Sequence, residues 1–267
     1  MTSNGTTWTV DTVRSADGTT IAYETAGEGP PIILVGGAFN DRSTTRALAA
    51  ALASDFTAYG YDRRGRGDSG DTGPYAVQRE IEDVAALIEV AGSRAYVYGL
   101  SSGAILAAYA AAEGLPITGL ALFEPPFQVG PHGGAKAELP DRLTELVSAG
   151  RRGDAVELFL TAAVGLPPNA VAGMRGMPEW SWMEGLAHTL AYDTTVTGDG
   201  PLPAARLGTI TAPTVVVDST GSPPWLRDAA AATASAIPGA THRSLEGGFH
   251  EVPPEHLAAE LRDSLLG

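Results

Sequence analysis

The chain of 267 residues contains no cysteine, and this absence excludes disulfide bonds and a thiol nucleophile. Lysine is almost absent too, because Lys136 is the one lysine among 17 basic residues. The 31 acidic residues outnumber the basic ones and give a net charge of −14 at pH 7. A surface this acidic argues against nucleic acids and anionic membranes as partners.

Long apolar runs and targeting segments are also missing. No apolar segment approaches the roughly 18 residues that a membrane-spanning helix requires. The N-terminal residues, MTSNGTTWTV, have neither the basic stretch nor the apolar run of a signal peptide. We therefore expect a cytoplasmic protein with no membrane partner. Its length and its hydrophobic content of 44% suit one large α/β domain with an insertion.

The segment from Arg94 to Ala112, RAYVYGLSSGAILAAYAAA, reads as an apolar strand, a sharp turn and an alanine-rich helix. Its turn, from Gly99 to Gly103, has the pattern G-x-S-x-G in the strand–turn–helix setting that makes this motif informative. The positions two before and two after the serine face each other, so only very small residues fit there. The helix begins under the serine and directs its free N–H groups toward a developing oxyanion. The pattern predicts a nucleophile at Ser101, with a chance match as the alternative in a chain with 33 glycines.

Hydrophobic patterning elsewhere predicts alternating strands and helices. Two alternating stretches flank the hairpin signal Asp17-Gly18, and short continuous apolar runs are typical of buried parallel strands. The predicted strands are Trp8–Ser15, Thr19–Ala26, Ile32–Val35, Thr57–Tyr61, Ala95–Tyr98, Ile117–Phe123, Thr214–Val217 and Thr241–Leu245. Besides the helix after the turn, helices are predicted at 43–54, 76–91, 223–237 and 256–266.

The turn from Gly99 to Gly103, which we call the elbow, and the strands around it resemble the α/β-hydrolases. The resemblance extends from about Thr19 to the C-terminus. It implies an α/β fold with a mostly parallel, eight-stranded sheet, helices on both faces and an active site at the C-terminal edges of the strands. The segment 62–70, DRRGRGDSG, fits no phosphate-binding motif. It resembles the Asp-x-Arg-Gly-x-Gly-x-Ser loop of this family, which is mostly structural, so we predict no catalytic role for it.

Two more loops match this family. Gly36-Gly37-Ala38-Phe39 follows the third strand, where the family usually has His-Gly-X and uses the N–H of X in its oxyanion hole. The resemblance therefore implies Ala38 and Ser102 as the oxyanion donors, with Gly36 in place of the common histidine. His250 lies in a glycine-containing loop between the last strand and the last helix, which matches the catalytic base and preserves the order Ser, acid, His. The other histidines are His132 and His188 in the insertion, His242 at the last strand and His256 on the last helix.

The acid that would complete a Ser-His-acid triad has two candidates. Most members of the family place it shortly after the strand predicted at 214–217, often before a proline, but Ser222 precedes Pro223 here. Two carboxylates remain, Asp218 at the tip of that strand and Glu124 at the tip of the preceding one. Some α/β-hydrolases, haloalkane dehalogenases among them, take the acid from the earlier position. We therefore favour Glu124 and keep Asp218 as the alternative acid.

The segment between Pro125 and Ala212, about ninety residues, exceeds what the core fold needs. It carries helical patterns at Leu139–Ala149, Asp154–Val164, Asn169–Met174 and Trp180–Tyr192. The family inserts a helical cap after this strand, the sixth, so we expect a core of residues 1–124 and 212–267 and a cap of residues 125–211. The residues predicted for the substrate pocket are Gly37, Phe39, Trp180, Trp182, Met183 and Tyr192. Packing of the cap aromatics on the core is an equally good interpretation.

The combined pattern predicts a serine hydrolase that cleaves an ester, lactone or thioester of a small apolar substrate through an acyl-enzyme. The resemblance implies no metal and no organic cofactor, a small molecule as partner, and no particular oligomeric state. Serine at the elbow speaks against the haloalkane dehalogenase and epoxide hydrolase branches, which use aspartate there. Lyases, cyclases and cofactor-free oxygenases on the same fold are alternatives, as is a ligand receptor that keeps the pocket.

Overall fold

The computed structural model describes residues 8–130 and 136–267 of the chain. Residues 1–7, on which the expectation about a signal peptide partly rests, and His132 lie outside the described residues. The described helices are all too short or too polar to cross a bilayer, and the longest of them, α2 (Val77–Val90), has 14 residues.

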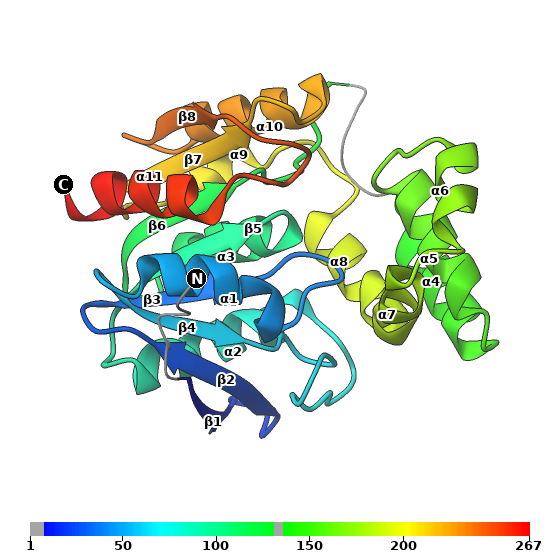
Figure 1. Cartoon of the computed structure of the whole chain (residues 1–267), viewed down its shortest axis with the longest axis horizontal. Coiled ribbons are helices and arrows are strands. Elements are labelled where there is room, and N and C mark those ends of the chain that lie inside the picture. The colour runs from blue at the N-terminus through cyan, green and yellow to red at the C-terminus, as the bar shows by residue number, and fades with distance from the viewer. Residues whose placement is uncertain (1–7, 131–135) are drawn as a thin grey trace, which may run out of the picture.

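An eight-stranded sheet forms the centre of the molecule (Figure 1). The strands are β1 (Thr9–Arg14), β2 (Thr20–Ala26), β3 (Pro31–Val35), β4 (Thr57–Tyr61), β5 (Ala95–Leu100), β6 (Ile117–Phe123), β7 (Thr214–Ser219) and β8 (Thr241–Leu245). Their order in the sheet is β1-β2-β4-β3-β5-β6-β7-β8. β2 pairs antiparallel with β1 and β4, and all the other pairs are parallel. The mostly parallel α/β sheet predicted from the sequence is therefore confirmed.

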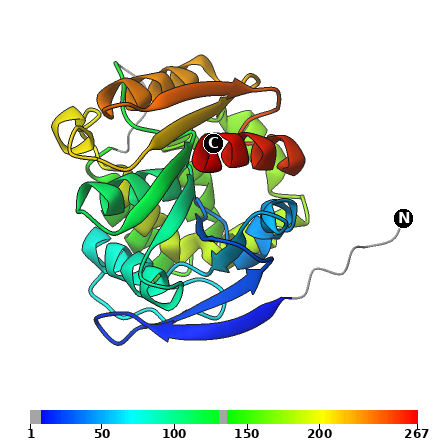
Figure 2. The same ribbon diagram turned by 90° about the vertical axis from the view of Figure 1, so that its left-hand side faces the viewer.

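Helices cover both faces of this sheet. α2, α3 (Ser102–Ala112) and α10 (Pro224–Ala236) pack on one face. α1 (Arg46–Leu52) and α11 (Pro254–Leu266) pack on the other, and Figure 2 shows these two helices, blue and red, together on one side of the strands. Successive residues of a strand point to opposite faces, so both faces of the central strands are apolar.

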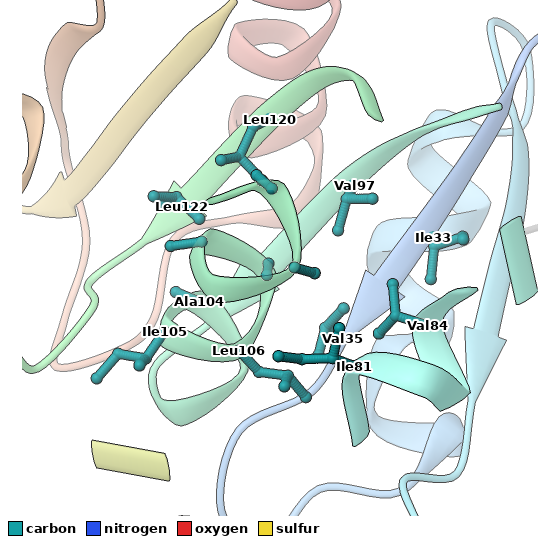
Figure 3. Close-up of a cluster of buried hydrophobic side chains, with 14 of the residues drawn as sticks. Ile33, Val35, Ile81, Val84, Val97, Ala104, Ile105, Leu106, Leu120 and Leu122 are labelled. Carbon is teal, nitrogen blue, oxygen red and sulfur yellow. The ribbon is translucent and has the colours of Figure 1, made fainter. Parts of the chain in front are cut away.

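The apolar residues of the central strands are divided between two clusters, one on each face of the sheet. In Figure 3, Val97 of β5 and Leu120 and Leu122 of β6 gather around the start of α3. On β3, Ile33 and Val35 join this cluster. Their neighbours Ile32 and Leu34 point to the α1–α11 face instead. Each of these fully buried side chains contributes roughly 1.5–3 kcal/mol of transfer free energy, which is why the strands could be recognised as continuous apolar runs.

The chain between β6 and β7 forms a helical insertion, residues 125–211. Its described helices are α4 (Leu139–Ser148), α5 (Arg152–Ala162), α6 (Pro168–Met174), α7 (Glu179–Leu186), a 3₁₀ turn (Ala187–Thr189), α8 (Leu190–Thr197) and α9 (Ala204–Leu207). Helices α4 to α7 form a group beside the sheet in Figure 1 and bury an apolar cluster of their own. α8 links this group to the core, because it contacts both α4 and α3.

The two connections of the insertion lie side by side. Gln128, after β6, and Pro201, before β7, form an isolated parallel β-bridge. The N–H of Leu202 donates to the Gln128 carbonyl at 3.0 Å. The insertion therefore leaves and rejoins the core at one place.

Two helices differ from the prediction. The helix expected at 43–54 begins with a 3₁₀ turn (Arg42–Thr45), because Asp41 accepts the Ser43 N–H and starts the turn one residue earlier. The single helix expected at Trp180–Tyr192 is interrupted by the 3₁₀ turn between α7 and α8. The Thr189 hydroxyl donates to the Leu186 carbonyl at this point and competes with the regular helical ladder.

Candidate active site

Ser101 lies at the turn between β5 and α3, at φ 56° and ψ −123°. The two glycines of the pattern permit this turn. A Cβ on Gly99 would lie 2.4 Å from the Gly103 carbonyl oxygen, and a Cβ on Gly103 would lie 2.4 Å from the Val35 carbonyl oxygen. Any side chain at either position would force the helix away from the strands. The close packing expected from the G-x-S-x-G spacing is therefore present.

A small cavity of about 50 Å³ lies at Ser101. It is lined by Ala38, Ser101, Ser102, Pro126, Phe159, Ala163, Val164, Asp193, Thr194, Thr197, Trp225, Phe249 and His250. The structure thus brings together the predicted nucleophile, the predicted base and the two predicted oxyanion donors. No hydrogen bond joins Ser101 to His250 among the described residues, and such bonds are often long until substrate binds.

The backbone N–H groups of Ala38 and Ser102 have no hydrogen-bond partner among the described residues. Ser102 is the first residue of α3, so its N–H lies at the positive end of the helix dipole. Ala38 follows β3 and lines the same cavity from the opposite loop. Both groups are free to donate to an anionic oxygen at Ser101.

The two candidate acids face different histidines. The Glu124 carboxylate is fully buried, and its Oε2 lies 2.5 Å from Nδ1 of His250, a close contact without the alignment of a hydrogen bond. The other oxygen of Glu124 accepts the Ser219 N–H at 2.8 Å. Oδ2 of Asp218 instead lies 2.6 Å from Nε2 of His242. Ser222, at the usual acid position, accepts the backbone N–H of His250 at 3.4 Å.

Backbone strain is concentrated at these residues. Among the described residues, five non-glycine residues have positive φ, and three of them are Ser101 (56°), Glu124 (50°) and His250 (52°). A fourth, Phe39, follows Ala38. Such conformations cost of the order of 1–3 kcal/mol each and gather at functional sites, where the surrounding structure holds them.

The six residues predicted for the substrate pocket lie outside the cavity at Ser101, so that prediction needs correction. None of Gly37, Phe39, Trp180, Trp182, Met183 and Tyr192 lines the cavity at Ser101. Trp180 and Met183 are buried in the insertion's own core, since α7 turns its apolar face inward. Trp182 is 44% exposed, and its indole donates to the Phe39 carbonyl. Tyr192 stacks on Tyr75. The alternative interpretation, that these residues pack the insertion, fits their contacts.

Sequence reasoning missed the residues that form the cavity wall. Phe159, Ala163 and Val164 come from the C-terminal end of α5 and the loop after it, and Trp225 comes from the start of α10. Their sequence segments read as ordinary helices and the turns beside them. Nothing local separates a side chain that lines a cavity from one that fills a core.

A buried ionic cluster, also missed, adjoins the cavity. It consists of Arg63, Arg66, Glu80 and Asp193, each at most 2% exposed. Arg63 pairs with both carboxylates, and Arg66 pairs with Asp193. Burial would raise the pKa of Asp193, but the neighbouring Arg66 and Arg63 more than offset this and lower it. Asp193 therefore remains charged inside the protein, and the two positive and two negative charges balance.

A second cavity, of about 550 Å³, lies beside His250 between α1 and α11 and does not include Ser101. Its walls are mainly apolar, with Leu48, Phe123 and Leu257 among them. No group of three or more His, Asp or Glu side chains converges as metal ligands would, among the residues that the structure describes.

Comparisons with known proteins agree with this fold. The model of the alpha/beta hydrolase family matches residues 32–260. The crystal structure of an alpha/beta hydrolase from Sphaerobacter thermophilus DSM 20745 is 51% identical and superposes with a TM-score of 0.89, covering 95% of this chain and 99% of that one. The enol-lactonase from Burkholderia xenovorans LB400, at 22% identity, has a TM-score of 0.72 over 96% of this chain and 100% of its own.

The uncharacterized hydrolase YraK of Bacillus subtilis (strain 168) is 36% identical over 93 residues, which are 33% of this chain and 34% of that protein. The match thus spans about a third of the length of that relative. The family model and the Sphaerobacter structure, in contrast, cover most of this chain. The chain belongs to the alpha/beta hydrolase family.

Proposed function

We propose that the protein is a serine hydrolase that cleaves an ester, lactone or thioester bond in a small apolar substrate. The observation that carries the proposal is the convergence of Ser101, His250 and two unpartnered N–H groups on one cavity, with Glu124 behind the histidine. The positive φ angles of Ser101, Glu124 and His250 also support the proposal. The likeness to an enol-lactonase fold is consistent with acyl transfer to water.

The proposed reaction begins when His250 removes the proton of the Ser101 hydroxyl as its Oγ attacks the substrate carbonyl carbon. The negative charge moves to the carbonyl oxygen, which the N–H groups of Ala38 and Ser102 stabilise. Collapse of this intermediate expels the alcohol or thiol, which takes the proton from His250, and leaves an acyl-enzyme. Water then attacks the acyl carbon with His250 again as base, and the acid departs. Glu124 orients the imidazole and stabilises its cationic form.

The cavity supports a small, uncharged acyl group as substrate. Apolar side chains make up most of its wall, and none of the described residues that line it is a lysine or arginine. Asp193, at its edge, is already neutralised by Arg63 and Arg66. A carboxylate on the acyl group would therefore lose its hydration without gaining a cation, which disfavours it. We propose that the insertion acts as the cap, because its α5 and α8 supply part of this wall.

The test is turnover of p-nitrophenyl acetate and butyrate by the wild-type protein and by Ser101→Ala. Loss of a triad nucleophile costs about 10⁶ in turnover, so the variant should be inactive while melting at the wild-type temperature. His250→Ala should be comparably inactive. His242→Ala is the matched control, because that histidine contacts Asp218 and lies outside the cavity. Wild-type labelling by a fluorophosphonate without turnover of any ester would favour a receptor or a non-hydrolytic enzyme.

A further inference from the structure

Asp193, on α8 of the insertion, reaches the core and contacts the elbow directly. Its Oδ1 accepts the Ser102 hydroxyl at 2.7 Å and Nη1 of Arg63 at 2.8 Å. Its Oδ2 accepts Nη2 of Arg66 at 2.8 Å. The carboxylate is 1% exposed, so it is held entirely by these partners. It is thus a charged group from the insertion that contacts the residue whose N–H is a proposed oxyanion donor.

The same two arginines hold the loop that carries the other donor. Nη1 of Arg66 donates to the Gly37 carbonyl and, at 3.1 Å, to the Asn40 carbonyl. Nη1 of Arg63 donates to the Gly36 carbonyl at 3.2 Å. Each guanidinium therefore bridges Asp193 and the backbone of the loop after β3, which a planar group with several N–H donors can do.

The contact with the Gly37 carbonyl fixes the direction of the Ala38 N–H. These two groups belong to one trans peptide unit, in which the C=O and the N–H point in opposite directions. Holding the carbonyl against Arg66 thus directs the N–H away from the arginine. The preceding N–H, of Gly37, is already taken by the Asn40 side chain at 2.9 Å. Ala38, which lines the cavity, keeps its N–H free.

We infer that Asp193 is a positioning residue that aligns both oxyanion donors, Ser102 by direct contact and Ala38 through Arg66. The inference rests on the proposed function. Buried ion pairs often contribute little net stability, because desolvation offsets the attraction, so geometry is the property that this cluster supplies. Since Asp193 belongs to the insertion, the donors are aligned only while α8 is seated on the core. The insertion then completes the catalytic site instead of only covering it.

The test is Asp193→Asn, a substitution of the same shape that removes the charge and presents an NH₂ group to donors. Removing an oxyanion donor costs about 10²–10³ in kcat, and misaligned donors keep part of their effect, so kcat for p-nitrophenyl acetate should fall about 10- to 100-fold. KM should stay within about two-fold, because the ground-state carbonyl binds weakly to these donors. The affinity for propylboronic acid, which forms a tetrahedral adduct with the serine, should fall by the same factor as kcat.

Tyr75→Phe is the matched control. Its hydroxyl donates to Glu80 at 2.8 Å and lies 3.4 Å from the Tyr192 carbonyl on α8. The variant therefore removes contacts of the same cluster and of α8 but leaves the contacts of Asp193, Arg63 and Arg66 with the elbow and the loop after β3 intact. It should lower the melting temperature without changing kcat. Arg66→Lys keeps the charge but cannot bridge Asp193 and two carbonyls, so it should reproduce the kcat loss even if Asp193→Asn fails to fold.

The outcomes separate the two proposals. If wild type turns over esters and the folded Asp193→Asn and Arg66→Lys variants keep the wild-type kcat, the cluster is structural and the positioning role is overturned. An equal loss of kcat in Tyr75→Phe would also overturn it. If wild type neither turns over an ester nor reacts with the fluorophosphonate, the proposed function fails, and the inference fails with it.

Discussion

Glu124 and Asp218 stand at the ends of neighbouring strands, and each is fully buried against a histidine. What distinguishes them is which histidine they contact. Glu124 contacts His250, which lines the cavity with Ser101, whereas Asp218 contacts His242 on β8, away from it. The pairing follows from strand register, because Asp218 lies beside Ser244 on β8 and so near His242. Each carboxylate contacts one histidine, and of these two histidines His250 is the one that lines the cavity.

The choice of acid is tested by comparing Glu124→Gln with Asp218→Asn. We expect Glu124→Gln to lower ester turnover by about 10⁴, because an amide cannot both accept from the imidazole N–H and stabilise its cation. Asp218→Asn should keep at least half of the wild-type turnover and lose some thermal stability. Melting temperatures of both variants exclude a folding defect. If Asp218→Asn is the inactive protein, Asp218 is the acid and the assignment of Glu124 is wrong.

At the scale of elements, the cavity wall is shared between the core and the insertion. Trp225 stands at the start of α10 in the core, whereas Phe159 on α5 and Val164 just after it belong to the insertion. In such an arrangement the size of the accepted acyl group depends on side chains from two parts of the chain. A cavity this small is filled by a few carbon atoms, so each wall residue should change the chain-length preference.

We expect Trp225→Ala to shift the preference toward longer acyl chains. Removing the indole lengthens the cavity, and one methylene in an apolar pocket is worth roughly 10- to 200-fold in kcat/KM. The ratio of kcat/KM for p-nitrophenyl hexanoate over acetate should rise at least about ten-fold. Trp182→Ala is the matched control, since Trp182 is exposed on α7 and outside the cavity. A rise with Trp182→Ala instead would restore the pocket predicted from the sequence.

The sequence predicted the helices and strands better than the contacts between side chains that are distant in sequence. β4 and β6 begin and end at the predicted residues, because most of their positions are buried and the patterning of the sequence reflects this. The elbow was recognisable because Gly99, Ser101 and Gly103 lie within five residues of sequence, although Gly103 is required by a contact with Val35 of β3. Asp193 was not, because it meets Arg63 across 130 positions of sequence, and the segment around it reads as an ordinary helix. The cavity wall was missed for the same reason.

At the scale of the whole molecule, the buried ionic cluster predicts a specific sensitivity to acid. Burial would raise the pKa of Glu80, but Arg63 outweighs this and lowers it from its ordinary 4.5, and the pKa of Asp193 is lowered as well. Because both pKa values are lower in the folded protein, the ionised carboxylates make it more stable than their protonated forms would, and this difference is fully present above pH about 4.5. This stabilisation is lost as the pH falls through the lowered folded values. Acid also relieves repulsion among the surface charges, which acts in the opposite direction.

The prediction is checked by urea unfolding of wild type and Glu80→Gln at pH 7, 5 and 3. Wild type should have the larger free energy of unfolding at pH 7, and the difference between the two proteins should shrink from pH 5 to pH 3. Comparing the two proteins cancels the effect of surface charge, which they share. Glu145→Gln, an exposed position on α4, is the control and should follow wild type at each pH. A difference that stays constant down to pH 3 would contradict the prediction.

The bridge between Gln128 and Pro201 bears on how such a protein can be altered. Because the chain leaves and re-enters the core at neighbouring points, the gap between them can be spanned by a few residues. We therefore expect the helices between these points to be exchangeable for the corresponding segment of a relative, with the order and register of the strands kept. A transplanted insertion would need a carboxylate where Asp193 stands to meet the two arginines that remain behind. Whether a transplanted insertion suits a given core would then depend on this one side chain as much as on the fit between the surfaces of the insertion and the core.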